Sequence, residues 1–445
     1  MKRLASAHDH KVEAVCAQVR DLAALGRPVH IRKGGVHHFV PQPRDTRFTG
    51  HAVDISALNA VLDIDLDART CTAEPGATFA DVVRHTLEHG LLPKVVPELE
   101  GITLGGAVAG CSVESMSYRY GGFHDTCREY EVVTGGGERR TLGPEDELFH
   151  MLHGSYGTLA ILTRVVFELV PAAPFVALTY HHHRDFAAFE DDMRERCAAG
   201  DFDFVDGIVH GPDHLVLCLG RFVDRAPSVS SYRGTGIYYR STGELSEDHL
   251  STFDYCFRYD TECHWLSRTA PPLEWRLVRR LVGRWFLGSE NLIRWSERLG
   301  LLLGRFTRRP DVVVDVFIPL RRFAEFWQWY EKELDFWPLW VVPYRVERPY
   351  PWIAPAHAAG LAGDLMVDCA VYGKRNNERD VDWSQAIEEK TYELGGIKTL
   401  ISRNHHTPER FWQIYDRERW EAAKRELDPG DLFSHLYDKF HVADS

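Results

Sequence analysis

A glycine-rich stretch in the first third of the chain carries the clearest chemical signal in the sequence. It runs from Pro97 to Asp125, and its centre, 103–110, reads Thr-Leu-Gly-Gly-Ala-Val-Ala-Gly. Glycines leave backbone N–H groups unshielded and permit positive φ angles, which are the features that a pyrophosphate cradle needs. The same residues are equally compatible with a tight glycine turn inside a hydrophobic core, because a glycine-rich loop alone is a weak motif.

Two further glycine turns flank this stretch. Upstream, 29–38 (VHIRKGGVHH) reads as a short strand that ends in a Gly34-Gly35 turn among basic and imidazole side chains. Downstream, 152–163 (LHGSYGTLAILT) reads as a glycine turn that leads into an alternating strand. The upstream turn is therefore a second candidate anion cradle.

Three consecutive histidines, His181 to His183, suggest a metal site at first sight. Successive residues of a strand project in opposite directions, whereas a metal needs ligands that converge. We therefore expect no metal site in this chain.

Taken in this order, the three glycine elements resemble the flavin domain of the vanillyl-alcohol-oxidase type of FAD enzymes. The resemblance implies that the first turn holds the FAD pyrophosphate. It also implies that the central stretch lines the pyrophosphate and the isoalloxazine, and that the third element packs beside the ring and the adenine.

The match narrows to one branch of these enzymes. The runs 91–106 (LLPKVVPELEGITLGG) and 113–125 (VESMSYRYGGFHD) are similar to the delta-24-sterol reductases of the Diminuto/seladin type. The similarity continues through 255–265, 365–373 and 411–440, so it covers most of the chain. Those reductases begin with a membrane-anchoring helix, which the start of this sequence does not resemble.

The resemblance implies an α+β fold, a PCMH-type FAD-binding domain with an α+β substrate-cap domain. We place the FAD-binding domain at 1–172, because the Pro-Ala-Ala-Pro run at 171–174 interrupts regular structure. The substrate cap is expected at 173–407. A C-terminal helical segment at 408–445 should pack back on the FAD-binding domain.

The residues that match the FAD-binding motifs of the resembled family form the predicted cofactor site. Gly105 and Gly106 are expected to tolerate no larger side chain, because the cofactor would approach the backbone there. The full predicted set is Arg32, Lys33, Gly34, Gly35, Val36, His37, Thr103, Leu104, Gly105, Gly106, Gly110, Ser112, Glu114, Ser115, Tyr120, Gly121, His124, Gly154, Gly157, Thr158 and Ile161.

FAD is expected to be bound without a covalent link. Some relatives of this superfamily attach FAD through a histidine that directly follows the Gly-Gly pair. Here Val36 occupies that place, and His37 and His38 come one residue late. The sterol-reductase branch itself binds FAD non-covalently, which agrees with this expectation.

Catalytic candidates come from two segments of the cap. Tyr255, Arg258 and Tyr259 match a sterol-reductase motif, although histidines of that motif are replaced here; they are the candidate acid relay, or alternatively part of a buried strand. Lys398 precedes the helical tail, where superfamily members place a cation near the flavin N1 and C2 carbonyl. A solvated loop is the alternative for Lys398.

Composition limits the class of protein. The chain has 445 residues, 44% hydrophobic and 26% charged, which is typical of a globular protein with more than one domain. A net charge of −13 argues against nucleic-acid binding through a basic surface. The nine cysteines contain no C-x-x-C pair, and no long apolar run occurs, so we expect a reduced, cytoplasmic protein.

Periodicity predicts the elements around these motifs. The first 26 residues read as a helix that Gly26 ends, 60–67 and 70–74 read as a hairpin, and Thr78 with Asp81 has the spacing of a helix N-cap. The cap should contain strands at 175–180, 204–209, 215–222, 312–318 and 365–372, with helices at 186–197 and 320–334.

The segment 273–309 combines nine arginines with three glutamates and three tryptophans. Basic aromatic segments bind anionic membrane surfaces, which would suit an enzyme that acts on lipid. On this interpretation, replacing Arg279 and Arg280 by Glu should abolish liposome binding. A helix docked in the cap, with its arginines paired internally, is the alternative.

The preferred function is an FAD-dependent reduction of an isolated, branched C=C bond in a lipid-like substrate, such as a sterol or a branched fatty acyl chain, with NADPH as the hydride source. The first alternative is an FAD-dependent alcohol oxidase or dehydrogenase. The second is a flavin-loaded binding protein without turnover. The sequence leaves the oligomeric state open.

Overall fold

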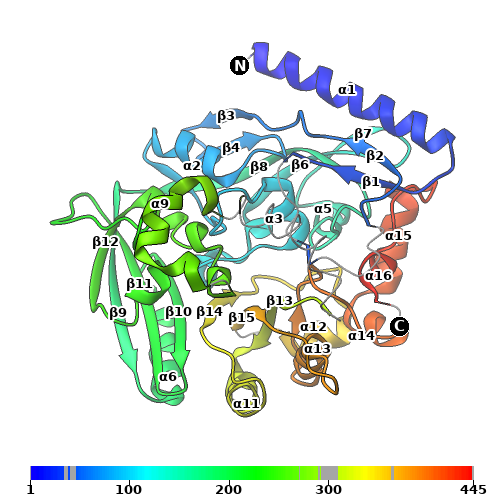
Figure 1. Cartoon of the computed structure of the whole chain (residues 1–445). Helices are drawn as coiled ribbons and strands as arrows, with labels where there is room; N and C mark the ends of the chain where they lie inside the picture. Colours follow the sequence, from blue (N-terminus) through cyan, green and yellow to red (C-terminus); the bar gives the residue numbers. More distant parts are fainter. Residues whose placement is uncertain are drawn as a thin grey trace.

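The computed structural model describes residues 2–34, 39–40, 47–269, 271–288, 291, 309–361 and 365–442. The chain opens with helix α1 (Lys2–Ala24), which confirms the predicted N-terminal helix. Its apolar residues Val12, Val15 and Val19 are buried against the parallel pair β1 (Val29–Arg32) and β2 (His51–Asp54). Figure 1 shows α1 lying across the outer edge of the first sheet.

The first sheet has six strands and forms the centre of the N-terminal half. Its order is β3 (Val61–Asp65), β4 (Thr70–Ala73), β8 (Ile161–Pro171), β6 (Cys127–Val133) and β7 (Arg139–Leu142), with β5 (Leu91–Pro93) paired to β8. The predicted hairpin is β3–β4. The predicted N-cap is present as well, because Thr78 Oγ1 accepts the N–H of Asp81 at 3.2 Å ahead of α2 (Phe79–Leu87).

The glycine-rich centre folds as a helix, α3 (Leu104–Gly110), rather than as the expected loop. Leu104, Ala107 and Val108 are completely buried in the main core, so tertiary packing overrides the low helix propensity of glycine. The turns that follow are α4 (Ser117–Tyr120), η1 (Phe123–Thr126) and α5 (Glu147–Met151).

The second half is built on one antiparallel sheet of eight strands. Its order is β12 (Glu247–Ser251), β9 (Phe175–His183), β11 (His214–Val223), β10 (Phe204–Gly211), β14 (Leu339–Arg345), β15 (Leu365–Lys374), β13 (Val312–Pro319) and β16 (Ile397–Lys398). Sequence periodicity missed the central strand β14, since its buried residues form a continuous apolar run without alternation.

The two faces of this sheet bury different cores. The outer face packs against α6 (Phe186–Ala199), η5 (Leu320–Arg322), α11 (Phe323–Trp329), the following π turn η6 (Tyr330–Leu334) and α13 (Trp383–Glu393). The inner face shares a continuous core with the first sheet and its helices. Figure 1 shows the two sheets on either side of α3, so the inner face of the second sheet is turned toward the N-terminal half.

Short elements complete the second half: α7 (Tyr238–Ser241), α8 (Thr252–Cys256), η2 (Asp260–Glu262), η3 (Leu266–Thr269), η4 (Pro271–Glu274), α9 (Arg276–Phe286) and α12 (Pro355–Leu361). The tail forms α14 (Pro408–Ile414), α15 (Arg417–Leu427) and α16 (Leu436–Phe440). Lys424 Nζ donates to Thr158 O at 3.0 Å, and Gly135 N donates to Leu427 O at 2.7 Å. The tail therefore contacts the N-terminal half, while the predicted boundaries at 172 and 407 stay a prediction.

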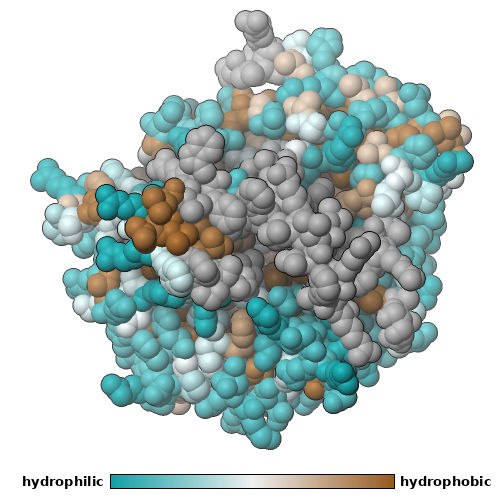
Figure 2. Space-filling view, in the orientation of Figure 1, coloured by the Kyte–Doolittle hydropathy of each residue, from teal (hydrophilic) through white to brown (hydrophobic). Residues whose placement is uncertain are grey.

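A group of exposed apolar side chains lies at α9 on the described surface. Trp275, Leu277 and Leu281 are exposed to 62%, 69% and 77%, and Figure 2 shows brown residues over this helix. Arg279 lies on the opposite side of α9, completely buried, and pairs with Glu262 at 2.6 Å. The expectation that Arg279 faces a membrane is therefore wrong. None of the described helices combines the length and the apolarity needed to cross a bilayer.

Candidate active site

A pocket that encloses about 600 Å³, part of it open to solvent, lies between the two halves. The N-terminal half contributes Gly110, Cys111, Val113, His124, Gly154 and Tyr156. The inner face of the second sheet and its neighbours contribute Phe317, Tyr344, Val346, Tyr350, Trp352, Ile353, Leu361, Met366, Ile397, Lys398, Thr399 and Tyr415. The walls are mostly aromatic and aliphatic, so the few polar groups among them must set any chemistry.

Lys33 brings a positive charge to the glycine-rich helix. A Cβ atom built on Gly106 would lie 3.9 Å from Lys33 Nζ and 3.2 Å from Thr103 Oγ1, so the end of β1 meets the start of α3 here. Within the described part of the chain, no hydrogen bond or ion pair satisfies this ammonium. Burial lowers the pKa of Lys33 to about 8. An anion such as a pyrophosphate would supply the missing partner, so these residues fit the predicted cradle.

The predicted third element lies on the same side of the pocket. Gly154 and Gly157 have φ of +65° and +72°, and a Cβ on Gly157 would come within 2.8 Å of Ile31 Cδ1. Glycine is thus required where this turn packs on β1. Thr158 is buried and Ile161 begins β8. The three predicted glycine elements are therefore adjacent in the fold.

Other members of the predicted cofactor set make contacts within the protein, and their role in cofactor binding stays a prediction. Arg32 is exposed and pairs with Asp54 at 2.7 Å, so it points away from Gly106. Tyr120 stacks under the Lys94 ammonium, and Gly121, at φ +75°, turns the chain close to Asp125. Ser112 accepts the N–H of Phe123 through its backbone oxygen. Gly35, Val36 and His37 lie outside the described residues.

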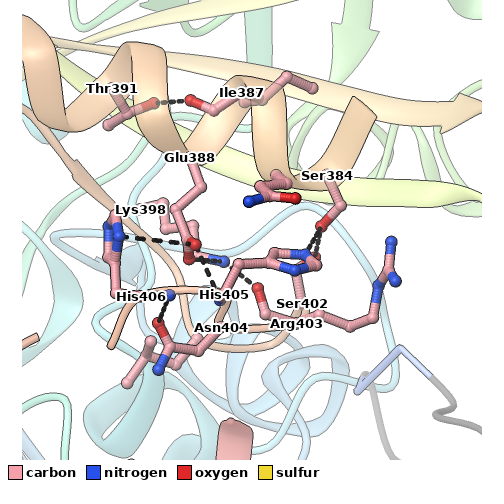
Figure 3. A network of polar contacts seen from close by, with 12 residues as sticks. Ser384, Ile387, Glu388, Thr391, Lys398, Ser402, Arg403, Asn404, His405 and His406 are labelled. Atoms are coloured by element: carbon pink, nitrogen blue, oxygen red, sulfur yellow. Dashed lines mark hydrogen bonds and ion pairs between the residues drawn. The ribbon is translucent and has the colours of Figure 1, made fainter. Parts of the chain in front are cut away.

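Lys398 lines the pocket from strand β16 and is fixed by a polar network (Figure 3). Its Nζ pairs with Glu388 Oε1 at 2.6 Å and donates to the backbone oxygen of Arg403. Burial alone would raise the pKa of Glu388, but Lys398 and His406 outweigh burial and lower it. Burial and Lys398 lower the pKa of His405 to about 4, so this imidazole is neutral at pH 7. Lys398 and Glu388 thus form a buried ion pair against the pocket wall.

A second polar network includes the pocket residues His124, Tyr344 and Tyr350. Tyr344 and Tyr350 are joined through their hydroxyls, and Tyr350 Oη donates to Asp125 Oδ2 at 2.7 Å. His124 Nε2 lies 3.4 Å from the same carboxylate oxygen, but neither ring nitrogen of this buried histidine makes a hydrogen bond among the described residues. Burial lowers the pKa of His124, so its imidazole is neutral at pH 7 and can hydrogen-bond a ligand.

Tyr255, Arg258 and Tyr259 do not line this pocket. They belong to a buried cluster in which Arg258 contacts Glu114 Oε1 at 2.7 Å and Asp206 Oδ2 at 3.1 Å. Tyr259 Oη donates to the same Asp206 oxygen at 3.2 Å, and Tyr255 Oη lies 3.1 Å from Ser115 Oγ. Burial, opposed by Arg258, raises the pKa of Glu114 to about 7. The cluster joins the 114–115 segment to strand β10, and its catalytic role stays a prediction.

Sequence reasoning missed two carboxylates on the inner face of the second sheet. Asp368 of β15 pairs in register with Phe317 of β13, and Asp315 lies two residues before Phe317 on the same face. Asp315 accepts the hydroxyl of Tyr372 and lies 3.4 Å from Thr399 Oγ1. A signal was available, because each aspartate interrupts an otherwise apolar strand, VVVDVFI and MVDCAV.

The side chains of His181 to His183 do not all point in different directions, as the sequence led us to expect. His181 and His183 share a face of β9, and both contact Asp192 Oδ2 of α6, at 2.7 and 3.1 Å. Among the described residues these are the side chains close enough together to hold a metal ion. His182 points to the other face of the strand, and its Nε2 donates to the backbone oxygen of Leu245 at 2.8 Å. The contacts join α6 to the sheet.

Comparisons with known proteins agree with this geometry. Residues 7–143 match the model of the FAD binding domain family. The Delta(24)-sterol reductase homolog of Caenorhabditis elegans is 23% identical over 98% of this chain and 87% of its own length. The human Delta(24)-sterol reductase is 23% identical over 97% and 86%, and the Arabidopsis thaliana enzyme is 23% identical over 97% and 84%.

The matched segment 7–143 contains Lys33 and the α3 glycines, which belong to the predicted anion cradle. The second sheet closes over this domain and completes the apolar pocket. The relatives extend the similarity across both halves at low identity. The chain is therefore an FAD-binding oxidoreductase with a PCMH-type FAD-binding domain and a cap, distantly related along nearly its full length to the delta(24)-sterol reductases.

Proposed function

We propose that this enzyme reduces an isolated, branched C=C bond in a lipid-like substrate, with NADPH as the reductant. The supporting observation is the pocket between the FAD-binding domain and the cap, whose walls are almost entirely apolar. A sterol side chain or a branched fatty acyl chain fits such walls by burial of apolar surface. The names of the relatives point to the same substrate class.

FAD, when bound, supplies hydride transfer. Lys33, Thr103 and Gly106 would hold its pyrophosphate, and Lys398 would place a positive charge against the ring system. We propose that no covalent bond forms, since Val36 stands where a covalently attached histidine would follow the Gly-Gly pair. The Glu388 carboxylate holds Lys398 in one position, which reduces the reorganisation needed during the reaction.

The protein must protect a cationic reaction centre. An unconjugated alkene has no carbonyl to accept a hydride, so protonation has to leave a positive charge on carbon, and a tertiary carbon bears it best. Aromatic walls such as Phe317, Tyr344 and Trp352 exclude water that would otherwise trap this charge. We propose that the buried Arg258 cluster holds the cap against the FAD-binding domain while this pocket is closed.

NADPH has no dedicated site in this proposal. The sequence lacks a second Gly-x-Gly-x-x-Gly after a strand, so the nicotinamide would bind transiently at the face of the flavin. A cytoplasmic location, as the nine unpaired cysteines favour, would give the enzyme access to NADPH.

Anaerobic stopped-flow absorbance of the flavin tests the function. We expect NADPH to bleach the oxidised flavin, and a branched alkene lipid to restore the colour of the reduced enzyme. An unbranched alkene serves as the control and should restore the colour far more slowly. Bleaching by an alcohol, with none by NADPH, would favour an alcohol dehydrogenase. No bleaching by NADPH, NADH or alcohols would favour a flavin-loaded binding protein.

A further inference from the structure

Asp368 is a buried carboxyl group beside the pocket. It lies on β15, two residues after the pocket residue Met366 and directly across the strand pair from the pocket residue Phe317. All three share one face of the sheet, because residues of a strand alternate and directly paired residues have Cβ atoms about 5 Å apart. The side chain is 2% exposed, so it lies in the interior, next to Phe317 and Met366, which line the pocket.

Within the described part of the chain, the Asp368 carboxyl makes no hydrogen bond, and its Oδ1 is fully buried. Burying an ionised carboxylate without a partner is strongly unfavourable, whereas a neutral carboxylic acid is tolerated far better. Buried polar groups without partners are rare in folded proteins, so each one calls for a role. A carboxyl of this kind is suited either to face a ligand or to keep its proton.

The groups packed around Asp368 favour the neutral form. Asp315 and Tyr372 lie near it on the same sheet. Glu98, from the FAD-binding domain, also lies near it. Glu98 pairs at 2.7 Å with His264, which belongs to the segment after α8. Burial, followed by the charges of Asp315 and Glu98, raises the pKa of Asp368 well above its ordinary value. Burial also raises the pKa of Asp315 to about 6. Burial and these negative neighbours therefore favour the protonated form of Asp368, beside a pocket whose walls are mostly apolar.

We propose that Asp368 is the acid that protonates the alkene, an assignment that rests on the proposed function. The O–H bond of Asp368 breaks, and its proton forms a C–H bond with the π electron pair at the less substituted carbon. The tertiary cation that remains accepts a hydride equivalent, supplied by the reduced cofactor at the expense of NADPH. Asp368 then takes a proton from water, so the net change is the addition of one hydride and one proton.

The same pair of carboxyls stabilises the charge that this step creates. After proton transfer, Asp368 is an anion next to a carbocation, and Asp315 adds a second negative charge on the neighbouring strand. In a pocket that excludes water, such attraction is much stronger than in solution. The hydroxyls of Tyr344 and Tyr350 also lie at the pocket, but burial raises their pKa well above the ordinary value, which makes them weak acids.

Replacement of Asp368 tests the assignment in the FAD-loaded enzyme. We expect Asp368→Asn to slow oxidation of the reduced enzyme by a branched alkene about 100-fold or more, as for loss of a general acid. Reduction by NADPH should change less than about twofold, since that step needs no proton at the alkene. Tyr344→Phe is the matched control in the same pocket and should slow alkene reduction less than about tenfold.

Two further readouts separate catalysis from structure. Infrared difference spectra of the resting enzyme at neutral pH should contain the carbonyl band of a neutral carboxylic acid, which Asp368→Asn removes. The alkene step should slow as the pH rises and Asp368 loses its proton. Asp315→Asn removes a negative neighbour, lowers the pKa of Asp368 and should move this loss of rate to lower pH.

The outcomes distinguish the two proposals. An ionised Asp368 at neutral pH, or an Asp368→Asn variant with the wild-type rate of alkene reduction, overturns the role of Asp368 and leaves the proposed function intact. A wild-type enzyme that no branched alkene reoxidises overturns the proposed function, and the alkene chemistry of Asp368 with it, even where the infrared band is present.

Discussion

The protonation state of Lys33 should control how tightly the protein binds FAD. Its ammonium has a pKa of about 8 because burial disfavours the charged form and no described group compensates. Above pH 8 the free protein loses this proton, and a bound pyrophosphate would restore it. We therefore expect FAD affinity to fall with rising pH above about 8, approaching tenfold per pH unit.

Fluorescence titration of the apoprotein with FAD measures this effect. The variant Lys33→Met should bind FAD at least tenfold more weakly at pH 7 and lose the pH dependence, since one charge-assisted contact is worth about 1.5–3 kcal/mol. Arg32→Met is the matched control, because Arg32 is the neighbouring cation and pairs with Asp54 at the surface. Equal losses in both variants would mean that Lys33 acts only through general electrostatics.

At the scale of an element, helix α3 gives different surroundings to two adjacent glycines, Gly105 and Gly106, that look alike in the sequence. A Cβ on Gly105 would lie 2.8 Å from Pro75 Cβ and 3.2 Å from the Pro75 backbone oxygen. A Cβ on Gly106 would instead point toward Thr103 Oγ1 and Lys33 Nζ, at 3.2 and 3.9 Å. Gly105 is needed for packing within the fold, whereas Gly106 faces the predicted cradle.

Substitutions at these two positions should therefore fail in different ways. We expect Gly106→Val to remain folded and to lose bound FAD. Gly105→Val should lower the melting temperature of the apoprotein, because the Pro75 backbone leaves no room for the valine side chain. Flavin absorbance per protein and thermal unfolding of apoprotein distinguish the two. Full flavin content in Gly106→Val would count against α3 as the cradle.

At the scale of the whole molecule, we propose that the predicted membrane contact of 273–309 is made through the exposed face of α9; residues 289–290 and 292–308 of that segment lie outside the described residues. Trp275, Leu277 and Leu281 are exposed there, and the neighbouring Arg276 and Arg280 are exposed as well, in a chain whose net charge is −13. Apolar side chains flanked by arginines suit the interface of an anionic bilayer. This surface excludes Arg279, whose guanidinium is paired inside the protein.

Sedimentation with liposomes tests this contact. We expect binding to anionic vesicles that weakens with salt, since charge attraction is screened beyond about 8 Å at physiological ionic strength. Arg276→Glu with Arg280→Glu should abolish binding and leave the flavin spectrum unchanged. Arg417→Glu with Arg425→Glu makes the same charge change on the exposed helix α15 and should bind normally. Equal recovery with neutral and anionic vesicles would contradict the electrostatic contact.

Local sequence determined the features that depend on a few consecutive residues. The hairpin β3–β4, the N-cap at Thr78 and the helix α1 follow from spacing and backbone preference, which act within a turn or two of the chain. FAD binding was predictable for the same reason, because its glycine motifs are short and specific to backbone geometry.

Tertiary structure alone decided which side chains meet. Asp315 and Asp368, or Lys398 and Glu388, come together only when strands and helices that are distant in the sequence pack side by side. Arg279 and Arg280 are adjacent in the sequence, yet one is buried in an ion pair and the other is exposed. Burial and the field of neighbouring charges are properties of the packed chain, and these set the pKa of Asp368 and the position of Lys398.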